Sequence, residues 1–139
     1  MRVTEVKLYV DGSVKKASQA DSRGRGAYKY MAVSQHGTLL HEQAFREDNQ
    51  TVPETELKAL IKGLAWFIES PYCQDALLHV FTDSELVFKW MTGAYRVRAE
   101  NIIPFYLKAK GLKEKIEQKG IYVQIEKIRG KDNLAHLEA

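Results

Sequence analysis

A change in hydrophobic period near residue 51 is the feature that most constrains the fold of this chain. Before it, three strand-like segments occupy residues 6–11, 26–33 and 38–45. The second and third are separated only by Gln35-His36-Gly37, which has the length of a hairpin connection. The first part of the chain therefore predicts an antiparallel meander of three strands.

A helix is predicted directly after the meander. Thr51 is followed by Pro53 and Glu54, and this spacing of threonine, proline and glutamate is typical of a helix N-terminus. Apolar side chains then recur at steps of three and four residues, at Leu57, Leu60, Ile61, Leu64 and Ile68. The helix therefore presents one apolar stripe for a sheet to cover, and Ser70-Pro71 ends it.

The rest of the chain alternates again between strand and helix patterns. We expect a buried strand at 77–81, helices at 84–91 and 101–118, a strand at 121–128 and a short last helix capped by Asp132. No repeat or linker divides the chain, and 139 residues can form one core. The element order predicts a single α/β domain over residues 1–139, with a mixed sheet flanked by helices.

Composition restricts the class of protein. A hydrophobic content of 45% and a charged content of 28% are ordinary for a globular domain. Cys73 has no second cysteine to pair with, so any metal must be held by oxygen or imidazole. The first seven residues carry charges where a secretory signal needs an apolar core, and no membrane-spanning run follows. We expect a cytoplasmic protein, and its net charge of +3 permits a polyanionic partner.

Three acidic residues are placed at the ends of these elements. Asp11 ends the first predicted strand, and Asp83 follows the strand at 77–81. Active groups gather where adjacent parallel strands end, so the two aspartates become neighbours if their strands pair. Glu56 lies in the first turn of the predicted helix, at the edge of its apolar stripe. The sequence thus predicts that three carboxylates converge.

Three clustered carboxylates are costly without cations, because like charges repel and raise one another's pKa. Magnesium prefers hard oxygen ligands and suits a few carboxylates together with substrate phosphates. Two such ions about 4 Å apart activate a water and stabilise the leaving oxygen in phosphodiester cleavage. The set therefore indicates a metal-dependent nuclease, although each acid alone also fits a turn, a helix N-terminus or an N-cap.

Four segments resemble, in order, motifs of type 1 ribonucleases H: Leu8 to Ser13, Gly24 to Tyr28, Thr51 to Leu60 and Phe81 to Val87. The resemblance implies a ribonuclease H-like α/β fold, a five-stranded mixed sheet whose first three strands are antiparallel. It implies that Asp11, Glu56 and Asp83 are catalytic and bind two divalent ions, Mg²⁺ or Mn²⁺. The stretch Tyr95 to Asn101 is similar to the short archaeal-like branch, which lacks a basic protrusion.

The same resemblance implies substrate contacts. Ser13 and the backbone of Gly24 to Gly26 are expected to meet ribose hydroxyls, and Thr51 a DNA phosphate. Trp90 is expected either to stack on the DNA strand or, as is commoner at its spacing, to join the core. The expected substrate-binding residues are Gly12, Ser13, Gly24, Gly26, Thr51, Ser84 and Trp90.

The C-terminal stretch departs from the family pattern. His136 stands where the family has its fourth metal-binding aspartate, and Asp132 lies four residues earlier. Either the acid is displaced by one helical turn to Asp132, or His136 is itself a catalytic metal ligand, which would tilt the preference from magnesium toward manganese. A third possibility is that His136 is only a surface residue. The family's mobile histidine is also missing, since the preceding loop is Arg129-Gly130-Lys131, and Val52 and Pro53 replace two asparagines.

These patterns lead to one main hypothesis and two alternatives. The main one is an endoribonuclease that cuts the RNA strand of RNA–DNA hybrids with two metal ions, leaving 5′-phosphate and 3′-hydroxyl ends. The alternatives are a catalytically weakened hybrid-binding module and a nuclease such as a junction resolvase, which fold alone does not separate. We expect a monomer with the hybrid as its partner, and neither a membrane nor an obligate protein partner.

Overall fold

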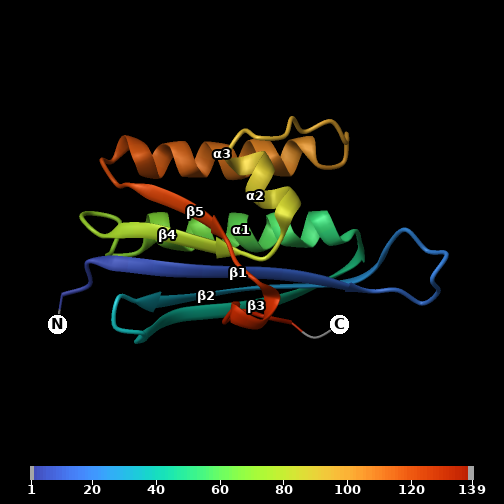
Figure 1. The fold of residues 1–139 in the computed structure, drawn as a ribbon, viewed down its shortest axis with the longest axis horizontal. Coiled ribbons are helices and arrows are strands. Elements are labelled where there is room, and N and C mark those ends of the chain that lie inside the picture. The colour runs from blue at the N-terminus through green and yellow to red at the C-terminus, as the bar shows by residue number, and fades with distance from the viewer. Residues whose placement is uncertain (1, 138–139) are drawn as a thin grey trace.

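The computed structural model describes residues 2–137 and contains one five-stranded sheet in the order β3-β2-β1-β4-β5 (Figure 1). The strands are β1 (Glu5–Lys15), β2 (Gly24–Ser34), β3 (Leu39–Gln50), β4 (Leu77–Thr82) and β5 (Val123–Lys127). The pairs β1–β2 and β2–β3 are antiparallel, whereas β1–β4 and β4–β5 are parallel. The predicted α/β fold with a mixed sheet and an antiparallel meander is confirmed.

The first hairpin is longer than the sequence pattern predicts. Pairing between β1 and β2 continues past Gly12 to Ser13 opposite Ala27 and Lys15 opposite Arg25. The apolar alternation stops at Gly12 because the hairpin runs on beyond the core, where backbone hydrogen bonds alone sustain the ladder. The hairpin therefore projects from one end of the sheet (Figure 1). Asp11 lies within β1 and not at its end, which corrects the sequence-based placement.

Helices cover one face of the sheet. They are α1 (Val52–Glu69), α2 (Glu85–Met91) and α3 (Ile103–Gln118). Helix α1 packs on β1 and β2, and α3 packs on α1 (Figure 1). None of the helices within residues 2–137 combines the length and the apolar run that a membrane crossing requires.

The N-terminus of α1 is fixed by the predicted capping box. The Thr51 side chain accepts a hydrogen bond from the Glu54 amide, and the Glu54 carboxylate accepts one from the Thr51 amide. Leu57, Leu60 and Leu64 then turn toward the sheet and are almost completely buried. Cap and apolar stripe together place Glu56 beside β1, because the first turn of the helix lies over Gly12.

The last segment contradicts the predicted helix after Asp132. A single 3-10 turn, η1 (Gly130–Asp132), ends before Asn133, whose backbone is extended. The Asn133 side chain donates a hydrogen bond to the Val10 carbonyl at 2.9 Å, and this bond ties the segment to β1 instead of continuing a helix. Asp132 and His136 therefore do not share a helix face.

We predict that Gly12→Ala destabilises the protein. A Cβ atom at this position would lie 2.6 Å from the Glu56 amide nitrogen, so the backbone of α1 would have to move. Overpacking of this kind costs about 1–3 kcal/mol or more in the free energy of unfolding, measurable by urea denaturation.

Gly111→Ala is the matched control. It lies inside α3 with no atom of another group within 4 Å of the added Cβ, so it should stabilise the protein by about 0.5–1 kcal/mol. Equal stability of Gly12→Ala and the wild type would show that β1 and α1 are not in the close contact described above.

Candidate active site

Asp11, Asp83 and His136 meet beside the central strand β1, at the point where the neighbouring parallel strand β4 ends. One potential ligand atom from each lies within 4.8 Å of the others. Asp11 comes from the middle of β1, and Asp83 follows Thr82, the last residue of β4, which pairs with Val10. His136 comes from the segment that Asn133 ties to β1. Three parts of the chain that are far apart in sequence therefore converge, as predicted for the two aspartates.

Asp11 is the buried member of this group, with 4% of its surface exposed. Its Oδ2 atom accepts a hydrogen bond from the Leu137 amide at 2.7 Å and lies 3.8 Å from Nδ1 of His136. Burial raises the pKa of Asp11, and the charge of Asp83 raises it further, although the Leu137 amide opposes both effects. Protein groups therefore offset only part of the cost of burying the negative charge of Asp11.

Glu56 approaches the same place from α1. Its Oε1 atom accepts a hydrogen bond from the Gly12 amide at 2.8 Å, whereas Oε2 is buried without a hydrogen-bond partner among the described residues. Burial, and then the charge of Asp11, raise the pKa of Glu56 to about 9. A buried carboxylate oxygen with no donor marks a position where a cation would restore the missing interaction.

The donor set fits a divalent cation. Asp11, Asp83 and Glu56 offer hard oxygen ligands, and His136 adds an imidazole nitrogen. The unpartnered oxygen of Glu56 and its charge coupling to Asp11 are the structural signs of that fit. These four residues are the ones that could hold metal.

Asp132 is placed differently. It is exposed, and its Oδ2 atom pairs with Nε of Arg129 at 3.1 Å. Within residues 2–137 it is not part of the cluster formed by Asp11, Asp83 and His136. Of the two candidates for the fourth ligand, the structure brings His136, and not Asp132, to the acids.

Asn133 is a site residue that the sequence analysis missed. It is 4% exposed, and its Nδ2 atom contacts both the Val10 carbonyl and, at 3.3 Å, Oδ2 of Asp83. Its Oδ1 atom accepts a hydrogen bond from the Ala135 amide. One amide side chain thus orients Asp83 and holds His136 in place, although only its position beside Asp132 could have drawn attention to it.

The expected substrate-binding residues differ in the contacts that they make within the protein. Ser13 is half-buried and lines a hollow next to Leu137. Gly24 and Gly26 pack too closely against neighbouring groups to carry a side chain. The Gly12 amide is already bonded to Glu56. The backbone at these glycines is therefore set by packing, and their contact with a substrate stays a prediction.

Thr51 and Ser84 serve as N-caps, of α1 and α2 respectively. Their hydroxyl oxygens accept backbone hydrogen bonds, from Glu54 and Val87. Trp90 is 8% exposed and belongs to the core. Trp90 therefore occupies the core position that its spacing favours, and its contact with a DNA strand stays a prediction.

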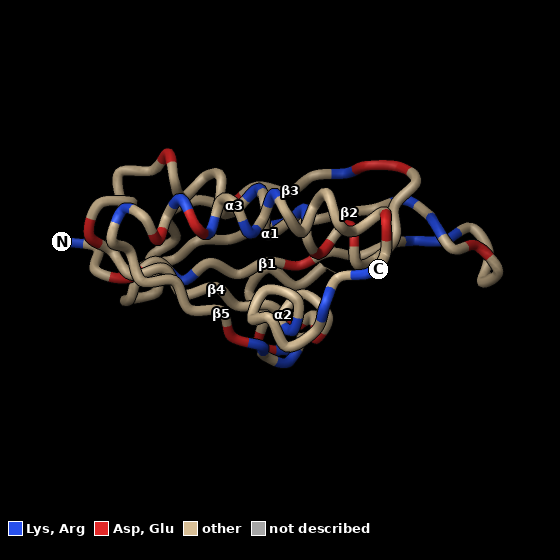
Figure 2. Tube along the Cα trace, turned by 90° about the horizontal axis from the view of Figure 1, so that it is seen from above, with Lys and Arg blue, Asp and Glu red and all other residues tan. Residues whose placement is uncertain are grey.

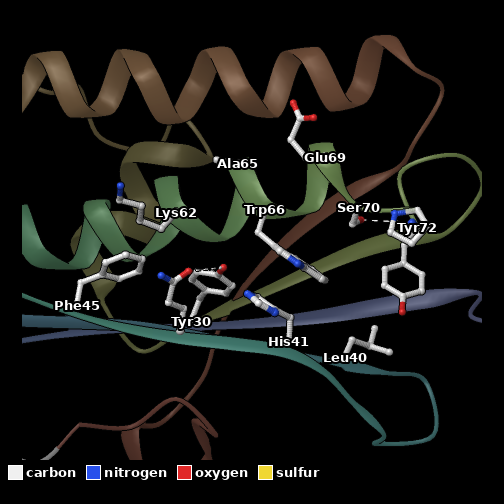
Figure 3. Close-up of a pocket in the computed structure, with 12 residues that line it drawn as sticks. Tyr30, Leu40, His41, Phe45, Lys62, Ala65, Trp66, Glu69, Ser70 and Tyr72 are labelled. Atoms are coloured by element: carbon white, nitrogen blue, oxygen red, sulfur yellow. Dashed lines mark hydrogen bonds between the residues drawn. The ribbon is translucent and has the colours of Figure 1, made fainter.

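A separate aromatic hollow of about 590 Å³ lies between β3 and the C-terminal half of α1 (Figure 3). His41 and Trp66 stack there with ring centroids 5.4 Å apart, and Tyr30 and Tyr72 each lie about 6 Å from Trp66. No residue of the acidic cluster lines it. This hollow is distinct from the candidate site, and its aromatic contacts hold α1 against the edge of the sheet.

No family model matches the sequence. Among solved structures, the chain is similar to the N-terminal ribonuclease H domain of a Mycobacterium tuberculosis protein, with 21% identity, a TM-score of 0.81 and coverage of 94% of this chain and 86% of that one. It is also similar to a compost-derived ribonuclease H1 crystallised with an RNA/DNA hybrid, with 20% identity, a TM-score of 0.80 and coverage of 94% and 89%. The ribonuclease H1 of Halobacterium salinarum gives 22% identity, a TM-score of 0.79 and coverage of 95% and 91%. The predicted resemblance to type 1 ribonucleases H is thus confirmed at the level of fold.

We predict that Glu56 makes the metal-free protein less stable as pH rises. Because the pKa of Glu56 is about 9 in the folded state and near 4.5 unfolded, the folded protein holds a proton that the unfolded chain releases between these values. The free energy of unfolding should fall through this window, by up to about 1.4 kcal/mol per pH unit. Glu56→Gln should flatten that slope, as measured by denaturation with a chelator present.

Glu114→Gln, which changes an exposed acid on α3, should keep the wild-type slope. A wild-type protein whose stability is constant between pH 5 and 9, or a Glu56→Gln variant with an unchanged slope, would contradict the prediction.

Proposed function

We propose that this chain is a ribonuclease H, an endoribonuclease that hydrolyses the RNA strand of RNA–DNA hybrids with two divalent ions, Mg²⁺ or Mn²⁺. The observation that carries the proposal is the convergence of Asp11, Asp83 and His136 beside the central strand β1, together with the buried, unpartnered oxygen of Glu56, whose charge interacts with both aspartates. The fold shared with solved ribonucleases H1 supports it, since one of those proteins was crystallised with an RNA/DNA hybrid.

The proposed reaction adds water across a phosphodiester bond. The water oxygen forms a bond to phosphorus, the bond from phosphorus to the 3′ oxygen breaks, and a proton goes to that oxygen. The products are a 5′-phosphate and a 3′-hydroxyl. Divalent ions in such sites supply charge neutralisation at the phosphate and lower the pKa of a water.

The residues of the chain provide position and charge for this reaction. Asp11 is oriented by the Leu137 amide, Asp83 by the Asn133 side chain, and Glu56 by the Gly12 amide. Each carboxylate is oriented by at least one protein hydrogen bond, so the carboxylate ligands are arranged before a cation or substrate arrives. His136 is half-exposed, with 52% of its side chain accessible, and forms the open side of the site.

We predict that Asp11→Asn and Asp83→Asn each abolish cleavage of a labelled RNA–DNA hybrid. Losing a carboxylate ligand removes several kcal/mol of transition-state stabilisation, so the rate should fall at least about a hundredfold. The assay compares the hybrid with double-stranded RNA, linear double-stranded DNA and branched double-stranded DNA, each with Mg²⁺ or Mn²⁺. Cleavage should be confined to the RNA strand of the hybrid.

Asp75→Asn is the control, because Asp75 is an exposed acid paired with Arg2 at the other end of β4, and it should cleave like the wild type. A wild type that binds the hybrid but leaves it intact with both metals would favour the hybrid-binding module. Cleavage of branched double-stranded DNA in place of the hybrid would favour a resolvase.

We predict that His136→Ala lowers the hybrid-cleavage rate and reduces the activity with Mn²⁺ relative to Mg²⁺. An imidazole is a softer ligand than a carboxylate and favours manganese, so its loss should remove that preference. His136→Asp should restore activity and shift it toward Mg²⁺. If both the rate and the metal preference of His136→Ala equal those of the wild type, His136 is not a ligand.

A further inference from the structure

A basic hollow of about 400 Å³ opens directly beside the candidate active site. Leu137 lines it, and the Leu137 amide donates to Asp11, so one residue separates the hollow from the acidic cluster. Lys15, Arg25 and Arg46 also line it. The hollow therefore adjoins the site at Leu137, and three of its nine lining residues are cationic.

The strand register explains why these three cations gather. Lys15 is paired with Arg25 across β1 and β2, and Ala27, two residues beyond Arg25, is paired with Arg46 of β3. Side chains two residues apart on a strand share a face, so Asp11, Ser13 and Lys15 lie on one face of β1. Alternate residues of β1, Val10 and Leu8, are buried on the face covered by α1. The basic hollow is thus on the face opposite α1.

The positive charge of the hollow is not neutralised within the protein. Among residues 2–137, Lys15, Arg25 and Arg46 take part in no ion pair, and all three are exposed. Of the two acids that line the hollow, Glu47 is paired with Lys58, and Asp48 alone opposes three cations. Figure 2 shows lysine and arginine along both strands of the projecting hairpin.

This arrangement costs stability in the free protein. Like charges directly opposite each other on paired strands are destabilising, and Lys15 and Arg25 are such a pair. An anion between them would remove the repulsion.

We propose that Lys15, Arg25 and Arg46 form a second contact site for the hybrid, which binds phosphates of its backbone outside the point of cleavage. The inference rests on the proposed function for the identity of the duplex. Lys15 lies four residues beyond Asp11, about 14 Å along the strand. One strand of a duplex carries a phosphate about every 3.4 Å of its axis, so a duplex lying along this face brings phosphates into the hollow.

The position of the hollow determines which kinetic constant it affects. A phosphate contact this far from Asp11 is equally strong before and during the reaction, so it lowers KM and leaves kcat unchanged. It also releases a bound counterion from the nucleic acid, which makes the affinity depend on salt. These two signatures separate a binding contact from a role in catalysis.

The test measures the affinity of an uncleaved hybrid. In the Asp11→Asn background with a chelator present, fluorescence anisotropy gives Kd for the hybrid as a function of monovalent salt. Adding Lys15→Gln and Arg25→Gln should raise Kd about tenfold or more at 0.1 M salt. The slope of the logarithm of the association constant against the logarithm of salt concentration should become shallower by about 1.8. In the cleaving protein the same pair should raise KM with kcat unchanged.

Lys110→Gln with Lys115→Gln is the matched control, since it removes the same charge from exposed positions on α3. The inference is overturned if the hairpin pair matches this control in Kd and salt slope, or if it lowers kcat with KM unchanged. The Lys15→Gln, Arg25→Gln double variant should unfold at the wild-type temperature or above it, because the substitutions remove a contact between like charges.

The outcomes for the site and for the hollow are distinguishable. A protein that binds the hybrid with the predicted salt signature but does not cleave it supports the hollow and rejects only the proposed activity. If the protein cleaves the hybrid and the Lys15→Gln, Arg25→Gln double variant has an unchanged KM, the proposed activity is supported and the second contact site is rejected. A protein that neither binds nor cleaves the hybrid rejects both.

Discussion

The burial of Asp11 and Glu56 within reach of each other's charge is the constraint on which the arrangement of the site depends. Both carboxyl groups are 4% exposed, and the pKa of each is raised by burial. The protein opposes this cost with single backbone donors, Leu137 for Asp11 and Gly12 for Glu56. It does not supply a lysine or arginine to the pair within residues 2–137, so the remaining charge is left for a cation to balance.

Strand β1 organises these groups because it occupies the centre of the sheet. One face of it receives α1 at Gly12, where the lack of a side chain lets the helix backbone approach. The other face receives the C-terminal segment, held by the bond from Asn133 to Val10. Asp11 lies between these two contacts, so anything that loosens either one also disturbs the carboxylate cluster.

Much of this arrangement follows from local sequence patterns. The capping box at Thr51 and the apolar stripe of α1 predict where Glu56 lies. The alternation in β1 and the apolar run of β4 predict two strands with Asp11 and Asp83 near their ends, and the observed pairing of these strands brings the two aspartates together. These features depend on interactions between residues close in sequence or on one strong period, so the sequence contains the information needed to predict them.

The errors arise where a distant contact decides the local structure. Beyond Gly12, β1 continues because it pairs with β2, although its own residues no longer alternate. The segment after Asp132 is not helical because Asn133 bonds to β1, 123 residues earlier in the chain. For Trp90 the sequence leaves two roles open, and its place in the core is established only by the packing of α2 on the sheet. Each of these outcomes is determined by tertiary packing rather than by propensity.

The continuous ladder between β1 and β2 has a further consequence. Because backbone hydrogen bonds join the two strands as far as Lys15 and Arg25, the projecting hairpin is an extension of the sheet and not a loose loop. The length of this ladder sets a fixed separation between the acidic cluster and the cations Lys15 and Arg25 at its far end. If the chain binds a duplex as proposed, the duplex has to cover that span to contact both, so a minimum duplex length follows from the length of the ladder.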